Sequence, residues 1–96
     1  MKISMYTIYF TKKMKKDLKR MRKRGINISE LTTVLEILSS GQELSEGYRD
    51  HQLSGDKADF RECHIDPDWL LIYRIENDKL ILTATETGSH ADLFGM

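Results

Sequence analysis

The sequence predicts an α+β domain in which two helices cover one face of a mainly antiparallel sheet. Two segments in the first half of the chain have apolar residues at helical spacing. The second half contains three segments rich in β-branched and aromatic residues, and turn signals separate them. Helices followed by a run of strands are typical of an α+β arrangement. A chain of 96 residues is long enough to bury one core, so we expect a single domain over residues 1–96.

The first half is predicted to form one strand and two helices. Residues 5–10 are rich in Tyr, Ile, Thr and Phe, which favour a strand. A first helix follows and ends near Gly25, because apolar residues recur there every three or four positions. Its apolar stripe consists of Phe10, Met14, Leu18 and Met21. A second helix is capped by Asn27 or Ser29 and stops at residues 39–41. Its apolar stripe consists of Leu31, Val34, Leu35 and Leu38.

The second half is predicted to form a meander of three strands. A polar linker over residues 42–53 and a turn over residues 54–57 precede it. The predicted strands are residues 60–65, 69–75 and 80–85. Pro67 separates the first two, because proline fixes its own φ and disfavours helix in the residue before it. The polar residues 76–79 make the last two strands a hairpin. The predicted order is therefore β-α-α-β-β-β.

The zero net charge of the chain conceals a polarised distribution. Residues 12–24 contain nine of the fifteen basic residues and one acidic residue, Asp17, which gives this segment a charge of +8. The segment lacks the interleaved signs of a solvated helix, so it favours nucleic acid or an acidic protein as partner. The alternative is a solvated helix face. The side chains expected to bind a polyanion are Lys15, Lys16, Lys19 and Arg20.

Composition and cysteine usage indicate the cellular compartment. No apolar run approaches the roughly 20 residues that a membrane span needs. The single cysteine, Cys63, cannot form an internal disulfide, which agrees with a reducing compartment, so we expect the cytoplasm. The charge of the neighbouring Glu62 disfavours a thiolate. We therefore expect Cys63 to be a buried structural thiol and not a nucleophile.

All three histidines lie in the second half of the chain, close to carboxylate or aromatic residues. His51 follows an aspartate, His64 lies four residues before Asp68, and His90 lies four residues before Phe94. If the segments that carry His51 and His90 return to the strand of His64, the three imidazoles and the carboxylate of Asp68 converge. Taken singly, each histidine is more typical of a structural or surface position.

Strand alternation bears on which side chains share a face. It places Glu62 and His64 on one face of the strand over residues 60–65, and Arg61 and Cys63 on the other. His64 and Arg61 therefore cannot both be in the core, and one face is available for a site. A guanidinium would join the imidazoles if Arg61 reached that face.

Three motifs combine these residues. They are Tyr-Arg-Asp-His-Gln-Leu-Ser-Gly at 48–55, Arg-Glu-Cys-His-Ile-Asp-Pro-Asp-Trp-Leu-Leu-Ile-Tyr at 61–73, and Thr-Gly-Ser-His-Ala-Asp-Leu-Phe-Gly at 87–95. Together they resemble the YafQ-like branch of the RelE superfamily of bacterial toxin-antitoxin ribonucleases. The order of one strand, two helices and a strand meander is also similar, so the resemblance implies a RelE-like fold over almost the whole chain. In the helices only the pattern is similar.

The resemblance implies the toxin of a type II toxin-antitoxin system. Such a toxin is a ribosome-dependent, metal-independent endoribonuclease that cuts mRNA in the ribosomal A site by 2′-hydroxyl attack, inhibits translation and needs no cofactor. It also implies a cognate antitoxin, and a heterotetramer built on an antitoxin dimer. The positions that match the family's functional residues are His51, His64, Asp68, His90 and Phe94, with Trp69 adjacent as a structural residue.

The expected chemistry assigns roles to these side chains. Cleavage without metal needs a base for the 2′-hydroxyl proton, a cation for the phosphorane, and an acid for the leaving 5′-oxygen. His90 and Asp68 are expected to transfer the protons, in an order left open. His51 and His64 stabilise the phosphate or take the second proton role. Phe94 is expected to bind the substrate by stacking on a base, and its alternative role is a hydrophobic plug on the core. Arg61 is expected to be an auxiliary cation. The remaining substrate-binding side chains are the four basic residues named above.

Three alternatives remain open at this point. A gyrase-inhibiting toxin of the ParE branch has the same fold but does not need the histidines. A metal-dependent hydrolase could use His64, Asp66, Asp68 and His90, although their spacing matches no recognised ligand motif. A noncatalytic binder of RNA or of an acidic partner would use only the basic segment.

Overall fold

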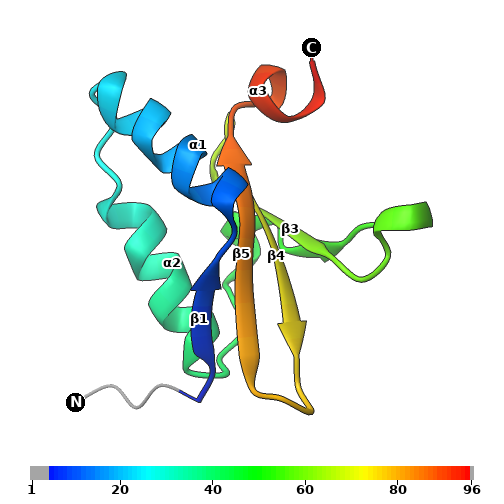
Figure 1. The fold of residues 1–96 in the computed structure, drawn as a ribbon. Helices are drawn as coiled ribbons and strands as arrows, with labels where there is room; N and C mark the ends of the chain where they lie inside the picture. Colours follow the sequence, from blue (N-terminus) through cyan, green and yellow to red (C-terminus); the bar gives the residue numbers. More distant parts are fainter. Residues whose placement is uncertain (1–4, 96) are drawn as a thin grey trace.

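A five-stranded sheet in the order β1-β5-β4-β3-β2 forms the centre of the structure (Figure 1), a computed structural model that describes residues 5–95. The strands are β1 (Thr7–Phe10), β2 (His51–Gln52), β3 (Arg61–Asp66), β4 (Trp69–Glu76) and β5 (Ile81–Gly88). β1 pairs in parallel with β5, and the other three pairs are antiparallel. The predicted mainly antiparallel sheet is therefore confirmed.

Three helices accompany the sheet. They are α1 (Lys12–Lys23), α2 (Ser29–Ser39) and α3 (His90–Phe94), and two short 3-10 helices are η1 (Glu46–Tyr48) and η2 (Gly55–Lys57). The β-α-α-β-β-β order is confirmed, and β2 and α3 are additions to it. In Figure 1, α3 (red) follows the end of β5 and lies near the C-terminus. Within residues 5–95, no helix has the length and apolar character to span a membrane.

α1 begins at a side-chain cap that also contacts the sheet. The Thr11 hydroxyl accepts a hydrogen bond from the Met14 amide at 3.0 Å and donates one to the Thr85 carbonyl at 2.6 Å. Met14, Leu18 and Met21 are buried, as their spacing predicts. Phe10 is not part of this stripe, contrary to the prediction: it is the last residue of β1 and 37% exposed. Its four-residue distance from Met14 is therefore coincidental.

α2 supplies the second apolar layer of the core. Leu31, Val34, Leu35 and Leu38 are buried, as predicted. Neither expected residue is the N-cap, which is Ile28 and makes no side-chain cap hydrogen bond. The carboxamide oxygen of Asn27 accepts from the Ser29 amide at 2.9 Å one residue before the cap. The helix stops before Gly41, whose φ of +83° is costly for a residue with a Cβ. Both helices pack with strand residues such as Leu71 and Leu82 in one apolar cluster.

Two core residues on the strands match their predicted structural roles. Cys63 is fully buried on β3, and burial raises the pKa of its thiol to about 12. It therefore remains protonated near neutral pH and is a poor nucleophile. Trp69 is 6% exposed, and its indole N–H donates to the Thr87 hydroxyl at 2.9 Å. Thr87 in turn donates to the Leu70 carbonyl at 2.6 Å, which closes the end of the β4–β5 pair.

A buried carboxylate joins α1 to the end of β5. Asp17 has no exposed surface, and one of its oxygens accepts from Lys13 at 2.6 Å and from Arg20 at 3.0 Å. The other oxygen accepts from the backbone amide of Thr87 at 3.2 Å. Two cations and one amide thus compensate a charge that would be costly to bury alone. The contact fixes α1 where the chain leaves the sheet for α3.

Candidate active site

The segments that carry His51 and His90 do return to the strand of His64, so the three histidines lie side by side. His51 is in β2, His64 in β3, and His90 is the first residue of α3. The ring centroids of His51 and His64 are 6.4 Å apart, and those of His64 and His90 are 5.9 Å apart. We call these three residues the histidine row. Each pair of neighbouring rings is close enough for both to lie beside one phosphodiester group.

Asp68 holds His90 at one end of the row. Its Oδ1 accepts from the His90 backbone amide at 3.0 Å and lies 2.7 Å from His90 Nδ1. The backbone amide and then the ring of His90 hold the pKa of Asp68 below its ordinary value. The carboxylate is therefore ionised near neutral pH and accepts from Nδ1–H. This arrangement leaves Nε2 of His90 as the nitrogen that can exchange a proton with a substrate.

Glu62 is a further site residue, which is not among those predicted from the sequence. It is 7% exposed, and its Oε1 lies 3.6 Å from Nε2 of both His51 and His64. The Nδ1 of His51 lies 2.8 Å from the Arg49 carbonyl, to which it can donate. One buried carboxylate thus compensates positive charge on either imidazole. Strand alternation had placed Glu62 on the face of His64, but its contact with His51 depends on the pairing of β2 with β3.

Phe94 lies beside the row and not in the core. Its side chain is 44% exposed, and its ring centroid is 6.5 Å from that of His90. α3 places the two residues about one helical turn apart, on the same side of the helix. The alternative of a hydrophobic plug on the core is therefore wrong. An exposed aromatic face next to a candidate catalytic imidazole can stack on a nucleobase.

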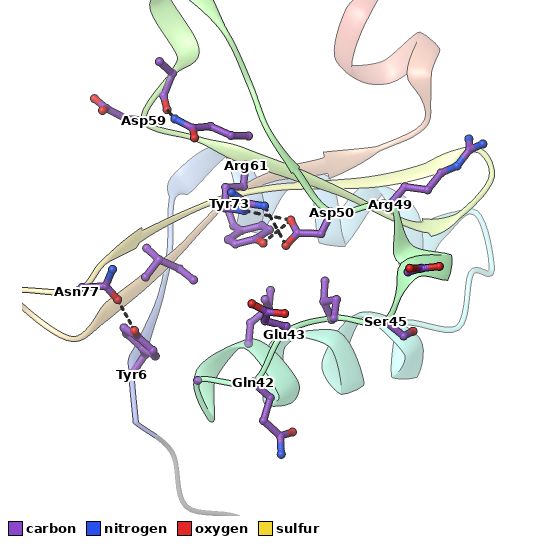
Figure 2. A pocket seen from close by; sticks show the side chains of 17 residues that line it. Tyr6, Gln42, Glu43, Ser45, Arg49, Asp50, Asp59, Arg61, Tyr73 and Asn77 are labelled. Atoms are coloured by element: carbon purple, nitrogen blue, oxygen red, sulfur yellow. Dashed lines mark hydrogen bonds and ion pairs between the residues drawn. The ribbon is translucent and has the colours of Figure 1, made fainter.

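Arg61 does not join the histidine row. Its guanidinium lies 3.3 Å and 3.4 Å from the carboxylate of Asp50, which also accepts from the Tyr73 hydroxyl at 2.6 Å. Burial raises the pKa of Tyr73, so the phenol remains a donor. The trio lines a cavity of about 850 Å³, and Tyr6 and Asn77, which hydrogen-bond to each other, line it as well (Figure 2). Alternation places Arg61 on the face opposite His64, so its expected substrate-binding role has no support in the geometry.

The basic segment forms the exposed surface of α1, with one exception. Lys15, Lys16 and Lys19 are exposed along the helix. Arg20 is not free to bind a polyanion, contrary to expectation. Besides its bond to Asp17, it donates to the Thr87 carbonyl at 3.3 Å and lies 3.6 Å from Asp92. Arg20 is thus a contact between α1 and the end of β5.

No metal-binding arrangement is present in the described part of the chain. Within residues 5–95, no three His, Cys, Asp or Glu side chains are placed to hold a metal ion together. His64, Asp66, Asp68 and His90, the ligand set of the hydrolase alternative, therefore form no such group. The carboxylates near the imidazoles act as hydrogen-bond partners, Asp68 for His90 and Glu62 between His51 and His64.

Known proteins are similar to this chain in sequence and fold. A family model described as the bacterial toxin of a type II toxin-antitoxin system, YafQ, matches residues 6–95. The chain belongs to the YafQ toxin family. The mRNA interferase toxin YafQ of Escherichia coli strain K12 is 37% identical over 89 residues, which cover 92% of this chain and 95% of that protein. The putative toxin YafQ of Haemophilus influenzae is 34% identical over 70 residues, which cover 70% and 69%.

Solved structures of bacterial toxins have the same fold. The toxin-antitoxin complex DinJ-YafQ of E. coli contains a chain that matches with a TM-score of 0.86 and 33% identity, covering 95% of this chain and 99% of that one. A metal-bound toxin from Helicobacter pylori matches with a TM-score of 0.87 and 43% identity, covering 94% and 100%. The RelE-like fold and the family resemblance that the three motifs indicate are thereby confirmed.

The hydrogen bond to Asp68 predicts an unusual proton position on His90 of this YafQ toxin. In the neutral ring we expect the proton on Nδ1, because the ionised carboxylate accepts from that nitrogen. Imidazole nitrogen NMR shifts, recorded above the titration range of histidine, report the tautomer directly. The Asp68→Ala variant should lose this preference, while the shifts of His51 serve as an internal control. A wild-type ring protonated on Nε2 would contradict the assignment.

Proposed function

We propose that this YafQ toxin is an mRNA interferase that cuts messenger RNA in the ribosomal A site and so inhibits translation in the cytoplasm. The observation that carries the proposal is the histidine row, with Asp68 fixing His90 at one end. Family membership supports it, since the E. coli relative is named an mRNA interferase toxin. A gyrase inhibitor or a noncatalytic binder would have no use for three adjoining imidazoles.

The proposed reaction is attack of a 2′-hydroxyl on the adjacent phosphorus. A base removes the hydroxyl proton, the bond to the leaving 5′-oxygen breaks, and an acid protonates that oxygen. The products are a 2′,3′-cyclic phosphate and a 5′-hydroxyl. His90 is the preferred residue for one proton transfer, because its Nε2 is free while Asp68 holds Nδ1. Asp68 then positions His90 and is not itself the proton donor.

His51 and His64 serve the other requirements of the reaction. A protonated imidazole offsets the charge that develops on the phosphorane oxygens, and either ring can supply the second proton transfer. Glu62 supports a positive charge on both. Phe94 stacks on a base of the message, a contact worth roughly 1–3 kcal/mol in single-stranded recognition. Every step is thus assigned to a side chain of this protein, and none requires a metal ion.

The exposed lysines of α1 give the toxin a surface for ribosomal RNA. Lys15, Lys16 and Lys19 lie on one helix with no acidic side chain exposed among them. Ribosomal RNA is a dense polyanion, so docking should release counterions and weaken steeply as salt rises. The same cationic surface complements an acidic partner, and we propose a cognate antitoxin as that partner. The DinJ-YafQ toxin-antitoxin complex of E. coli supports such a pair. We further propose that toxin and antitoxin assemble as a heterotetramer built on an antitoxin dimer.

Loss of His90 tests the catalytic proposal. The variant His90→Ala should cut a reporter message about 10² to 10⁴ times more slowly, because one positioned proton-transfer group is removed. Primer extension in a reconstituted translation system locates the cuts, with and without ribosomes and with EDTA at a concentration that ribosomes tolerate. Cuts should require ribosomes and His90 but survive EDTA.

The control for this experiment is Asp78→Asn, an exposed change in the turn between β4 and β5. It should cut at the wild-type rate, and both variants should unfold at similar temperatures. A His90→Ala protein as active as this control would contradict the role of His90. Loss of cutting in EDTA would contradict the metal-free mechanism.

Loss of the α1 lysines tests the docking surface. A triple variant with Lys15→Gln, Lys16→Gln and Lys19→Gln should bind ribosomes with a weaker salt dependence. The plot of log affinity against log salt concentration should become less steep, by up to about 3 in the magnitude of its slope. The slope is obtained from sedimentation binding at several salt concentrations. The matched control is Lys57→Gln with Lys79→Gln, two charges outside α1. Equal slopes for the triple variant and the control would mean that α1 is not the docking surface.

A further inference from the structure

The helix that carries His90 has little apolar packing to hold it. α3 contains five residues, none of which is buried. A helix of this length is unstable by itself, since the cost of its first turn is not recovered over so few hydrogen bonds. Asp68 contacts His90 directly, but Asp68 itself lies in an exposed turn. The position of His90 therefore depends on other contacts of α3.

One carboxylate connects the start of α3 to the end of α1. Asp92 accepts a bidentate pair of hydrogen bonds from Arg24, at 2.8 Å and 3.1 Å. It also accepts from the Ser89 amide at 3.0 Å, while the Ser89 hydroxyl accepts from the Asp92 amide at 3.1 Å. Ser89 is the N-cap of α3 and directly precedes His90. The bond from Arg24 holds the pKa of Asp92 well below its ordinary range, so the ion pair is intact near neutral pH.

Arg20 supports this connection from the side of the core. Its Nη2 donates to the Thr87 carbonyl at 3.3 Å and lies 3.6 Å from Asp92 Oδ2. Gly88 is the residue that permits the approach: a Cβ at this position would lie 2.8 Å from Asp92 Cβ and 2.9 Å from Arg20 Nη2. Arg20 thus holds the backbone at Thr87, and Asp92 holds it at Ser89, the residue immediately before His90.

We propose that the ion pair of Arg24 with Asp92, supported by Arg20, is a latch that positions His90 for proton transfer. The inference rests on the proposed ribonuclease function and adds positioning residues to it. The latch also ties the catalytic histidine to α1, the helix whose lysines dock on ribosomal RNA. Docking of α1 then fixes where His90 meets the message. Arg24 is 47% exposed, so the pair should contribute little to global stability and act mainly on the position of α3.

The test uses Arg24→Gln, Asp92→Asn and the double variant in the reconstituted cleavage assay. Each single change should lower the maximal cleavage rate by about tenfold to a hundredfold, as expected when a reacting group is slightly misplaced. The concentration of toxin at half-maximal rate should change by less than about twofold, because binding is not affected. The double variant should be no slower than the slower single variant, because the two changes break one interaction.

The matched control is Arg22→Gln, which removes the same charge from the same helix. Arg22 is exposed, and within the described residues its side chain has no acidic partner. This variant should keep the wild-type maximal rate. An equal fall in the maximal rate for Arg22→Gln and Arg24→Gln would overturn the latch, since charge alone would then explain the loss. A change confined to the half-maximal concentration would also overturn it, because Arg24 would then contact RNA directly.

A measurement on the free protein separates the latch from the proposed function. Amide hydrogen exchange of α3 should accelerate in Arg24→Gln and Asp92→Asn, and the imidazole shifts of His90 should move, whether or not the protein cuts RNA. Unchanged exchange and unchanged shifts would overturn the latch. If wild type and His90→Ala were equally inactive while these signals moved as expected, the ribonuclease function would fail and the latch would remain a structural feature of α3.

Discussion

The buried charge of Asp17 is the interaction on which the arrangement of the site depends. A carboxylate without partners is costly to bury, so α1 must lie where Lys13, Arg20 and the Thr87 amide reach Asp17. This requirement joins an early helix to the last strand, about 70 positions apart in the chain. The Thr87 hydroxyl also accepts a hydrogen bond from the Trp69 indole, so the same residue joins the end of β5 to the start of β4. The chain leaves the sheet immediately afterwards, and α3 then presents His90.

The site combines a rigid strand with two exposed segments at its sides. β3 supplies Glu62 and His64 on one face while Cys63 on the other face is buried in the core, so the central imidazole is held by the sheet. His51 comes from a two-residue strand and His90 from a short helix, and each is oriented by an oxygen acceptor on Nδ1. Orienting acceptors of this kind place imidazole nitrogens before a substrate arrives, which is the condition for effective proton transfer.

The sequence predicted the elements that are long enough to show a period. α1 and α2 were predicted from apolar spacing, and their buried stripes agree with it except at Phe10. β1 and the three long strands were predicted from β-branched and aromatic composition and from turn signals. β2 and α3 were missed because two and five residues cannot show a period. The motifs predicted the three histidines and Asp68 together. Glu62 was not assigned to the site, and Arg20 was expected to bind a polyanion and not to contact the end of β5. Their partners are set by strand pairing and by the packing of α1, which are not local properties.

The central claim is that the histidine row cuts mRNA by attack of a 2′-hydroxyl. The most direct test is a message with a single 2′-deoxynucleotide on the 5′ side of a mapped cut, presented on ribosomes. The account predicts that cutting stops at this codon and continues at an unmodified copy of the codon in the same message. Cutting at both codons at the same rate would contradict the mechanism, because no 2′-oxygen would then be needed as nucleophile.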